Sequence, residues 1–246
     1  MNEFELARHR HQMGRSLELL SRAGPRPHCE HGPGFWMACS GVASPDANVA
    51  LIETDDAATR RHVLEAIRES ELPVTVVLAG PGLAVDLGED WRHVGDMPLM
   101  EISLAAREFA RDGRVRAASE TDVDAISELL ASAYSISRDE SNAVAAFAAT
   151  GSTEGTMWLL VDQYPVATAF TAILNDAVCI WSLATPQRYE RRGYARALLD
   201  DVLSRARDAS ARIGLLGATP AGAPLYLRNG WRTIETWRLF TQHREH

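Results

Sequence analysis

Apolar residues recur at helix and strand spacings along the chain, and Gly, Pro, Asn and Asp separate the runs. In residues 3–22, Leu6, Met13, Leu17 and Leu20 fall on one helical face, and Gly24-Pro25 ends the pattern. The pattern then predicts strands at 35–39 and 49–52, a helix at 56–69, a strand at 74–78, a turn at 80–82, a short helix near 83–88 and a strand near 99–104.

The sequence Arg111-Asp112-Gly113 is the best boundary between two domains, because the pattern starts again after it. Beyond it we predict, in order, a strand at 115–118, a helix that Thr121 caps, a helix near 141–149, strands at 157–161, 166–174 and 178–183, a helix at 193–209, a strand at 213–216, a helix at 221–228 and a strand at 233–240. This order predicts a mixed α/β fold with a mixed sheet, divided into domains 1–112 and 113–246.

The composition is that of a globular protein, with 46% apolar and 24% charged residues among 246. No run reaches the length of a membrane span, and the N-terminus has no apolar signal core. The three cysteines form no CxxC pair, which favours reduced thiols. We therefore expect a cytoplasmic protein.

The chain contains no lysine, because all 25 basic residues are arginine. This excludes a lysine Schiff base and a GxxxxGK[ST] phosphate loop. Two explanations stay open: the codon bias of a GC-rich genome, and selection against self-modification by a reactive acyl donor. Residues 1–112 hold 11 Arg and 18 Asp or Glu, a net charge of −7, and residues 113–246 hold 14 and 15, a net charge of −1. Nucleic-acid binding is not expected from this balance.

The segment from Trp181 to Leu203 carries the strongest chemical signal. A buried strand ends at 184–186, a basic turn runs from Arg188 to Gly193, and an amphipathic helix starts at once. A helix N-terminus offers unpaired N–H groups and partial positive charge. Gly193 and Ala195 lack bulk, and the arginines nearby, Arg191, Arg192 and Arg196, supply counter-charge. These features predict a pyrophosphate site.

The sequence Glu190-Arg191-Arg192-Gly193-Tyr194-Ala195 resembles the acyl-CoA signature of the GCN5-related N-acetyltransferase (GNAT) family, Gln/Arg-x-x-Gly-x-Gly/Ala. The first position differs from the family signature, because Glu190 stands where the family has Gln or Arg. A carboxylate near a phosphate is unfavourable, and we expect Arg188 to offset its charge. The resemblance covers about residues 114–242. It implies that acetyl-CoA is the cosubstrate, with no metal. The implied CoA contacts are Leu183, Ala184, Thr185, Arg191, Arg192, Gly193, Tyr194, Ala195 and Arg196.

The segment from Gly222 to Trp231 is similar to the late helix and Gly-aromatic turn of the same family. The resemblance places Tyr226 as the acid that protonates the departing CoA thiolate. It also implies that the strand end near 182–185 splays from its neighbour and frees backbone groups for the pantetheine amides and the thioester. The first half resembles a degenerate copy, as in tandem acetyltransferases. Its corresponding turn, 53–59, has three acids and no glycine, so we expect no CoA site there.

Several roles stay open at this stage. The general base is unassigned among four loop carboxylates, Asp139, Glu140, Glu154 and Asp176. The strand tryptophans Trp158, Trp181 and Trp237 line either an acceptor pocket or the core. His28-Cys29-Glu30-His31 is a surface connection or, less in keeping with known ligand spacings, a zinc site.

The function expected from the resemblance is transfer of an acetyl group from acetyl-CoA to the amine of a small-molecule acceptor. No membrane partner is expected, and a homodimer is compatible with the family. Two alternatives remain: a regulatory module that binds acyl-CoA without turnover, and acyl transfer from another carrier, such as an aminoacyl-tRNA or a carrier protein. The two tandem domains would then share the GNAT fold, with one working site in residues 113–246.

Overall fold

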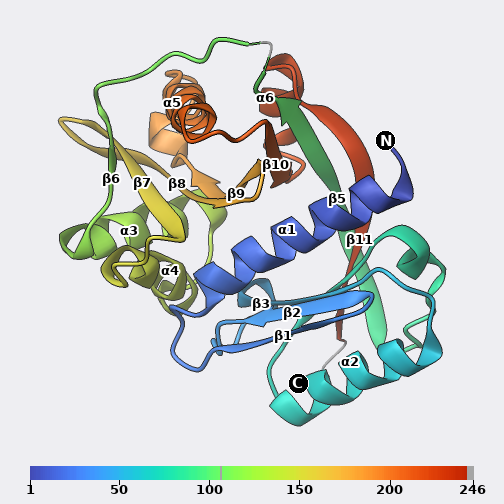
Figure 1. Cartoon of the computed structure of the whole chain (residues 1–246). Helices are drawn as coiled ribbons and strands as arrows, with labels where there is room; N and C mark the ends of the chain where they lie inside the picture. The colour runs from blue at the N-terminus through green and yellow to red at the C-terminus, as the bar shows by residue number, and fades with distance from the viewer. Residues whose placement is uncertain (106, 243–246) are drawn as a thin grey trace. The chain divides into compact units, whose positions relative to one another are not determined.

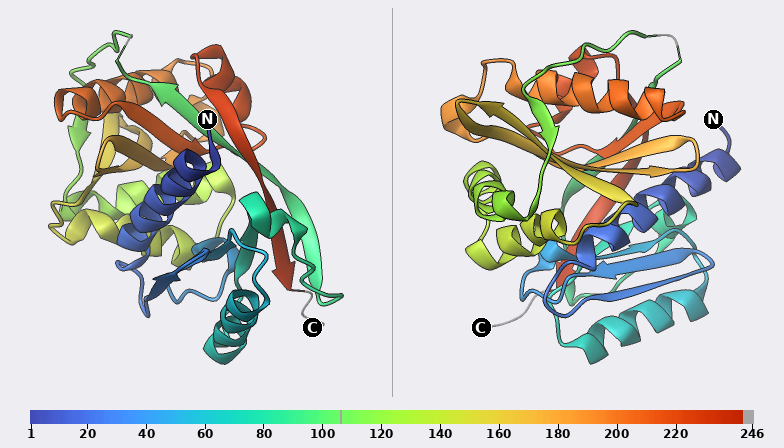
Figure 2. Two further views of the ribbon diagram at one scale, coloured as in Figure 1. Left: turned by 45° about the vertical axis from the view of Figure 1, so that its right-hand side comes forward. Right: turned by 60° about the vertical axis from the view of Figure 1, so that its left-hand side comes forward.

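The computed structural model describes residues 1–105 and 107–242, which form two compact units. Unit 1 comprises residues 1–100 together with the described part of 217–246, and unit 2 comprises residues 101–216. Figure 1 and Figure 2 show the ribbon, and each unit is described by itself.

Unit 1 is a sheet with strand order β1-β2-β3-β4-β11-β5 and helices on both faces. Its elements are α1 (Glu3–Ser21), β1 (His28–Gly32), β2 (Phe35–Cys39), η1 (Pro45–Ala47), β3 (Asn48–Ile52), α2 (Ala57–Ser70), β4 (Thr75–Leu78), η2 (Gly80–Ala84), β5 (Trp91–Ser103, whose last three residues belong to unit 2), α6 (Ala223–Arg228) and β11 (Arg232–Gln242). Strands β3 and β4 run parallel, while the pairs β1–β2, β2–β3 and β4–β11 are antiparallel.

Strand β2 is buried on both faces because a helix covers each one. Trp36 packs against Gly14 of α1, where an added Cβ would lie 2.6 Å from the indole ring. Phe35 and Met37 point to the other face and form a core cluster with Val63 and Ile67 of α2. Figure 1 and Figure 2 show α1 and α2 on opposite sides of β1–β3.

Unit 2 has the strand order β10-β9-β8-β7-β6. Its elements are β6 (Val115–Ala117), η3 (Glu120–Asp122), α3 (Val123–Tyr134), α4 (Arg138–Ala145), η4 (Ala146–Ala149), β7 (Gly155–Asp162), β8 (Tyr164–Leu174), β9 (Ala177–Ala184), η5 (Gln187–Tyr189), α5 (Tyr194–Asp208) and β10 (Ile213–Gly217). The strands from β6 to β9 pair antiparallel, and β9 and β10 are parallel. Helix α5 covers one face, and α3 and α4 cover the other (Figure 1, Figure 2).

The two units repeat one order of elements. In each, a helical segment precedes three antiparallel strands, a helix and a strand parallel to the third: α1-β1-β2-β3-α2-β4 in unit 1 and α3-α4-β7-β8-β9-α5-β10 in unit 2. Helices α2 and α5 therefore hold corresponding positions, as do the parallel pairs β3–β4 and β9–β10.

The mixed α/β fold with a mixed sheet is confirmed, and most predicted elements are present. The two compact units do not divide at residue 112. Helix α6 and strand β11, from the C-terminal part of the chain, pack with the first hundred residues. The division into 1–112 and 113–246 separates two sequence halves and stays a prediction.

The structure differs from the prediction at five places. Residues 28–32 form the edge strand β1, whose polar residues gave no apolar run. Residues 80–84 form η2 in place of a helix at 83–88, and β5 begins at Trp91, well before its buried part at 99–102. Thr121 is not a cap, because Ser119 precedes η3 and Asp122 precedes α3. Helix α4 starts earlier than predicted, at Arg138, because Ser137 and Glu140 form a capping box.

Asp122 holds the start of α3 through charged hydrogen bonds. Both guanidinium nitrogens of Arg116 donate to it at 2.7 Å, and these bonds, with those from Ser119, lower the pKa of Asp122 to about 2. A depressed carboxyl pKa stabilises the folded state above its unfolded value near 4, and this stability is lost as the pH falls toward 2.

We expect Asp122→Asn to lower the free energy of unfolding by about 1 kcal/mol at neutral pH, because solvent screens the half-exposed Arg116. Urea denaturation at a series of pH values measures this. The difference from the wild type should shrink between about pH 4 and about pH 2. A difference that stays constant over this range would contradict the proposed ion pair.

Candidate functional site

Strand β9 leaves its parallel neighbour before it ends. The register with β10 covers Ala177–Ile180, whereas β9 itself continues to Ala184 beside β8. Between the pairs Phe170↔Trp181 and Thr168↔Ala184, one β8 residue faces two β9 residues, Ser182 and Leu183, which is a β-bulge. Ser182 has a φ of +55°, a left-handed conformation that bends the strand here.

The bulge places predicted contact residues at this strand end. Leu183 packs its side chain on the cluster beneath α5, and its carbonyl oxygen accepts a hydrogen bond of 2.8 Å from the Tyr134 hydroxyl. Ala184 is buried and pairs with Thr168. The buried hydroxyl oxygen of Thr185 has no hydrogen-bond partner among the residues that the structure describes. An unpaired buried hydroxyl is costly, so a ligand that bonded to it would gain free energy.

The N-terminus of α5 follows directly after a turn with two left-handed residues. Arg191 has a φ of +63° and Gly193 a φ of +83°, and no side chain caps the helix. The first intrahelical bond runs from the Ala197 N–H to the Gly193 carbonyl, so the N–H groups of 193–196 have no partner within the helix. A Cβ added at Gly193 would meet no atom within 4 Å. The space beside Gly193 is therefore open, which leaves room for an anion at this helix end.

Basic side chains surround this turn. Arg191 and Arg192 are exposed on it, and Arg196 is exposed and lies 3.5 Å from Asp200. Arg188 points away to an ion pair with Glu128 at 3.0 Å and stacks on Tyr189. We predicted that Arg188 would offset the negative charge of Glu190, but in the structure Arg188 pairs with Glu128.

Tyr194 ties the start of α5 to the sheet. Its hydroxyl hydrogen-bonds to Asp162 at the end of β7, which raises the pKa of Tyr194. Arg114 lies 3.6 Å from Asp162 and 5.7 Å above the Tyr194 ring. Tyr194 was predicted as a CoA contact, and in the structure its side chain bonds to Asp162 of the sheet.

In unit 1, the positions that correspond to the β9 end and the α5 N-terminus are the end of β3 and the N-terminus of α2. There the helix is capped and the two parallel strands stay paired. The Asp56 side chain accepts the Thr59 N–H at 2.7 Å and so caps α2. The Ala79 N–H donates to the Ile52 carbonyl at 3.1 Å, so β3 and β4 stay joined at their ends. The η2 turn also lies against this point, because a Cβ added at Gly82 would sit 2.2 Å from the Ile52 oxygen.

A buried arginine fills the space beside η2. Arg10 is 1% exposed and bonds to Glu3, Glu53 and Glu235, and Glu235 also accepts the Gly80 N–H at 3.0 Å. Burial raises the pKa of Glu53, against the opposing effect of Arg10. Three carboxylates and no free helix end make this place unsuited to a phosphate.

Tyr226 lies on α6 in unit 1, and it is 8% exposed. Its ring meets Trp231 edge-on at 5.8 Å between centroids. Burial raises the pKa of Tyr226 to about 12, so the phenol keeps its proton at neutral pH. Among the described residues, no hydrogen bond involves its hydroxyl.

Residues 123–231 match the sequence profile of the acetyltransferase (GNAT) family. This part of the chain is similar to GNAT-family acetyltransferases. The match runs from the first residue of α3 to Trp231 and includes the α5 turn and Tyr226. No curated protein matches the chain.

Solved structures share the fold of the whole chain. A GCN5-related N-acetyltransferase from Kribbella flavida superposes with a TM-score of 0.68 at 19% identity, over 98% of this chain and 96% of that one. A GCN5-related N-acetyltransferase from Sphaerobacter thermophilus superposes with a TM-score of 0.56 at 16% identity, over 85% of this chain and 76% of that one. Saccharomyces cerevisiae N-myristoyltransferase with bound myristoyl-CoA superposes with a TM-score of 0.57 at 10% identity, over 81% of this chain and 60% of that one.

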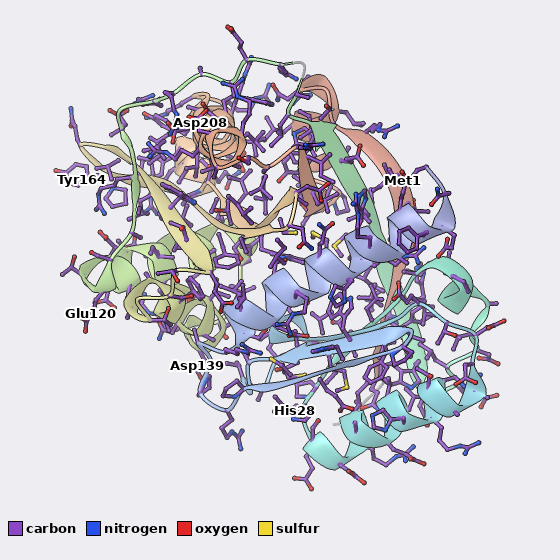
Figure 3. The ribbon with its side chains drawn as sticks, in the orientation of Figure 1. Met1, His28, Glu120, Asp139, Tyr164 and Asp208 are labelled. Carbon is purple, nitrogen blue, oxygen red and sulfur yellow. The ribbon has the colours of Figure 1, made fainter. Side chains whose placement is uncertain are left out.

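The four candidate bases differ in their surroundings. Glu140 accepts the Ser137 N–H at 2.7 Å in the α4 capping box, so it has a structural role. Asp139 lies exposed on α4 (Figure 3), and Glu154 is exposed before β7. The Asp176 backbone carbonyl accepts N–H groups from Arg212 and Ile213. No one of the four is singled out as the base.

Two of the three tryptophans are fixed within the fold. The Trp158 indole donates to the Thr171 hydroxyl at 2.8 Å, and Arg205 stacks on its ring at 5.0 Å. Trp237 is fully buried and donates to Glu235 at 2.7 Å, so of the two roles left open for it, it takes the one in the core. Trp181 is half-buried on β9.

The histidine-rich segment is the edge strand of unit 1. Glu30 pairs with His62 at 2.7 Å, and His31 pairs with Glu18 at 3.3 Å. Over residues 1–105 and 107–242, no group of three or more His, Cys, Asp or Glu side chains could hold a metal ion. Over the same residues, no helix is long and apolar enough to cross a membrane.

Sequence reasoning missed Tyr134 and Asp162. Tyr134 ends α3, about fifty positions before the carbonyl that it contacts, and a tyrosine at a helix end is too common to single out. Asp162 lies just beyond the strand predicted at 157–161, and as the last residue of β7 it bonds to Tyr194, 32 positions further along the chain.

Proposed function

We propose that the chain is an N-acetyltransferase that moves an acetyl group from acetyl-CoA to the amine of a small-molecule acceptor. One observation carries the proposal: the uncapped, glycine-started N-terminus of α5 follows a strand, β9, that has left its neighbour. The GNAT-family match over residues 123–231 supports it.

The pyrophosphate of CoA would bind at the α5 turn. The N–H groups of Gly193, Tyr194, Ala195 and Arg196 have no helical partner, and the helix dipole adds positive charge. Arg191 and Arg192 would supply counter-charge. Glu190 is exposed beside them, so its carboxylate can turn to solvent.

The pantetheine arm would lie along the free end of β9. Leu183, Ala184 and Thr185 provide backbone groups there, and the Thr185 hydroxyl is an additional donor or acceptor. The Leu183 carbonyl has a second lone pair beside the one that Tyr134 uses, so it can still accept an amide N–H. Backbone donors at this strand end would stabilise the negative charge on the thioester oxygen.

The transfer then needs two proton movements. The neutral amine nitrogen attacks the thioester carbon, a C–N bond forms, the C–S bond breaks, and a base or water accepts the proton lost by nitrogen. The thiolate takes a proton, which we assign to Tyr226. With a pKa of about 12, this phenol stays protonated and acts mainly by hydrogen bonding to the sulfur as negative charge develops.

We propose one CoA site per chain and interpret unit 1 as derived from a second GNAT-like copy. The repeated order of elements supports a common origin. The Asp56 cap and the closed ends of β3 and β4 support loss of CoA binding in that copy. Sequence halves 1–112 and 113–246 would be the two copies, with α6 and β11 packed into unit 1.

The acceptor is proposed to be a cationic small molecule, because residues 1–112 carry a net charge of −7. The three cysteines are free thiols, which fits a reducing, cytoplasmic setting. A homodimer remains part of the proposal from the family resemblance.

Release of the CoA thiol from acetyl-CoA, measured with a panel of small amines, tests the function. We expect turnover with at least one cationic amine and none without an amine. Binding of acetyl-CoA without turnover on any amine would favour the regulatory module. Failure to bind free CoA would favour a different acyl carrier.

A further inference from the structure

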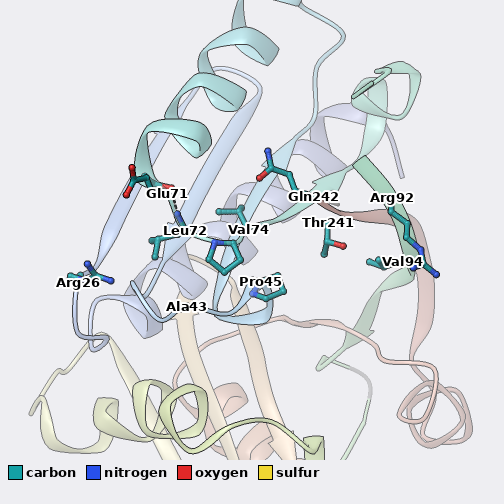
Figure 4. Close-up of a pocket in the computed structure, with 12 residues that line it drawn as sticks. Arg26, Ala43, Pro45, Glu71, Leu72, Val74, Arg92, Val94, Thr241 and Gln242 are labelled. Carbon is teal, nitrogen blue, oxygen red and sulfur yellow. Dashed lines mark hydrogen bonds between the residues drawn. The ribbon is translucent and has the colours of Figure 1, made fainter. Parts of the chain in front are cut away.

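Unit 1 contains a hollow at the end of its sheet where β4 begins and β11 ends. Its volume is about 680 Å³, within the range of small-molecule pockets. Figure 4 shows its lining: Arg26, Ala43, Pro45, Ser70, Glu71, Leu72, Pro73, Val74, Arg92, Val94, Thr241 and Gln242. All of these residues belong to unit 1, and none belongs to the α5 turn or to β9.

Arginines lie at the two ends of this hollow, Arg26 at one and Arg92 at the other (Figure 4). Arg92 is exposed, and within the described part of the chain its guanidinium has no carboxylate partner. The Arg26 guanidinium donates a long bond of 3.4 Å to the Gly41 carbonyl, and Arg26 lies at the same end as Glu71. The lining therefore has a net charge of +1, in a chain whose net charge is −8.

Apolar side chains cover the middle of the hollow. Leu72, Val74 and Pro45 lie between the two arginines in Figure 4, and Val94 beside Arg92 is 52% exposed. Apolar surface left in water favours a ligand that covers it, by about 25 cal/mol per Å².

A buried polar group adds an independent indication. Thr75 pairs directly with Thr241 across β4 and β11, so the two side chains share a face, and Thr241 lines the hollow. Thr75 is 5% exposed, and its hydroxyl has no hydrogen-bond partner among the described residues. A buried hydroxyl without a partner thus lies beside Thr241, one of the lining residues.

We propose that this hollow binds an amphipathic monocarboxylate, with its carboxylate on Arg92 and its apolar body over Leu72, Pro45 and Val94. A guanidinium binds a carboxylate through paired N–H donors. Glu71, the acidic residue of the lining, lies at the Arg26 end of the hollow and not at the Arg92 end. A lining with a net charge of +1 favours a monoanion over a doubly charged phosphate. This site is separate from the proposed acetyl-CoA site.

Calorimetric titration of the full chain with sodium octanoate, in the presence of saturating CoA, tests the site. We expect binding of octanoate, and none of octylamine, which has the same tail and the opposite charge. Acetate, which has the carboxylate alone, should bind far more weakly because it covers no apolar surface.

Arg92→Gln should weaken octanoate binding about tenfold, which corresponds to about 1.4 kcal/mol. Arg68→Gln removes an equally exposed arginine from α2, outside this hollow, and should leave the affinity unchanged. Absence of octanoate binding, equal binding of octylamine, or full affinity in Arg92→Gln would each overturn the proposal. None of these outcomes bears on CoA turnover.

Discussion

Gly193→Val should weaken acetyl-CoA binding more than tenfold, a loss of over ~1.4 kcal/mol. The valine side chain would enter the open space in front of the α5 amides, where the structure has no atom within 4 Å of a Cβ. It would keep a phosphate from approaching the N–H groups of 193–196. The φ of +83° also opposes any β-branched residue, so the turn itself would shift.

A matched variant separates the two effects. Gly88 has a φ of +88° and also has no atom within 4 Å of a Cβ, but it lies in unit 1. Gly88→Val should carry a similar backbone strain and bind acetyl-CoA with unchanged affinity. Calorimetry on both variants, with circular dichroism to confirm folding, measures this. Wild-type affinity in a folded Gly193→Val protein would remove the assignment of the turn.

Tyr226→Phe should lower kcat and kcat/KM together, by at most about 10²–10⁴-fold, and leave the affinity for CoA nearly unchanged. The variant keeps the ring that packs on Trp231 and removes only the hydroxyl. The hydroxyl is expected to act only as charge develops on sulfur, so its loss affects the transition state and not ground-state binding.

The control is Tyr164→Phe, which removes the hydroxyl of a tyrosine that is 69% exposed on β8. It should turn over at the wild-type rate. Single-turnover measurements ensure that chemistry limits the rate being compared. If Tyr226→Phe also turns over at the wild-type rate, water or the proton lost by the amine protonates the thiolate, and Tyr226 only anchors α6.

Sequence alone located the α5 turn because its chemistry is local. A buried strand, a basic turn, a glycine and an amphipathic helix follow one another within 23 residues, and each has its own signal. The divergence of β9 from β10 near its end, expected from the resemblance, is present. Helix α2 was likewise predicted, because Val63 and Ile67 recur at helical spacing and are buried.

What escaped prediction depends on long-range packing. The Tyr134–Leu183 bond joins positions 49 residues apart, and Arg10 meets Glu235 across 225. The association of α6 and β11 with unit 1 is of the same kind. Strand β1 was missed because an edge strand needs no apolar run; its partner β2 supplies the hydrogen bonds.

The central claim is that the chain binds acetyl-CoA at one place, the N-terminus of α5. Isothermal titration of the full chain with acetyl-CoA tests it most directly, since the stoichiometry counts the sites. We expect one acetyl-CoA per chain, with that binding weakened in Gly193→Val. Two equivalents per chain would show that the capped N-terminus of α2 also binds CoA, and no binding would contradict the claim outright.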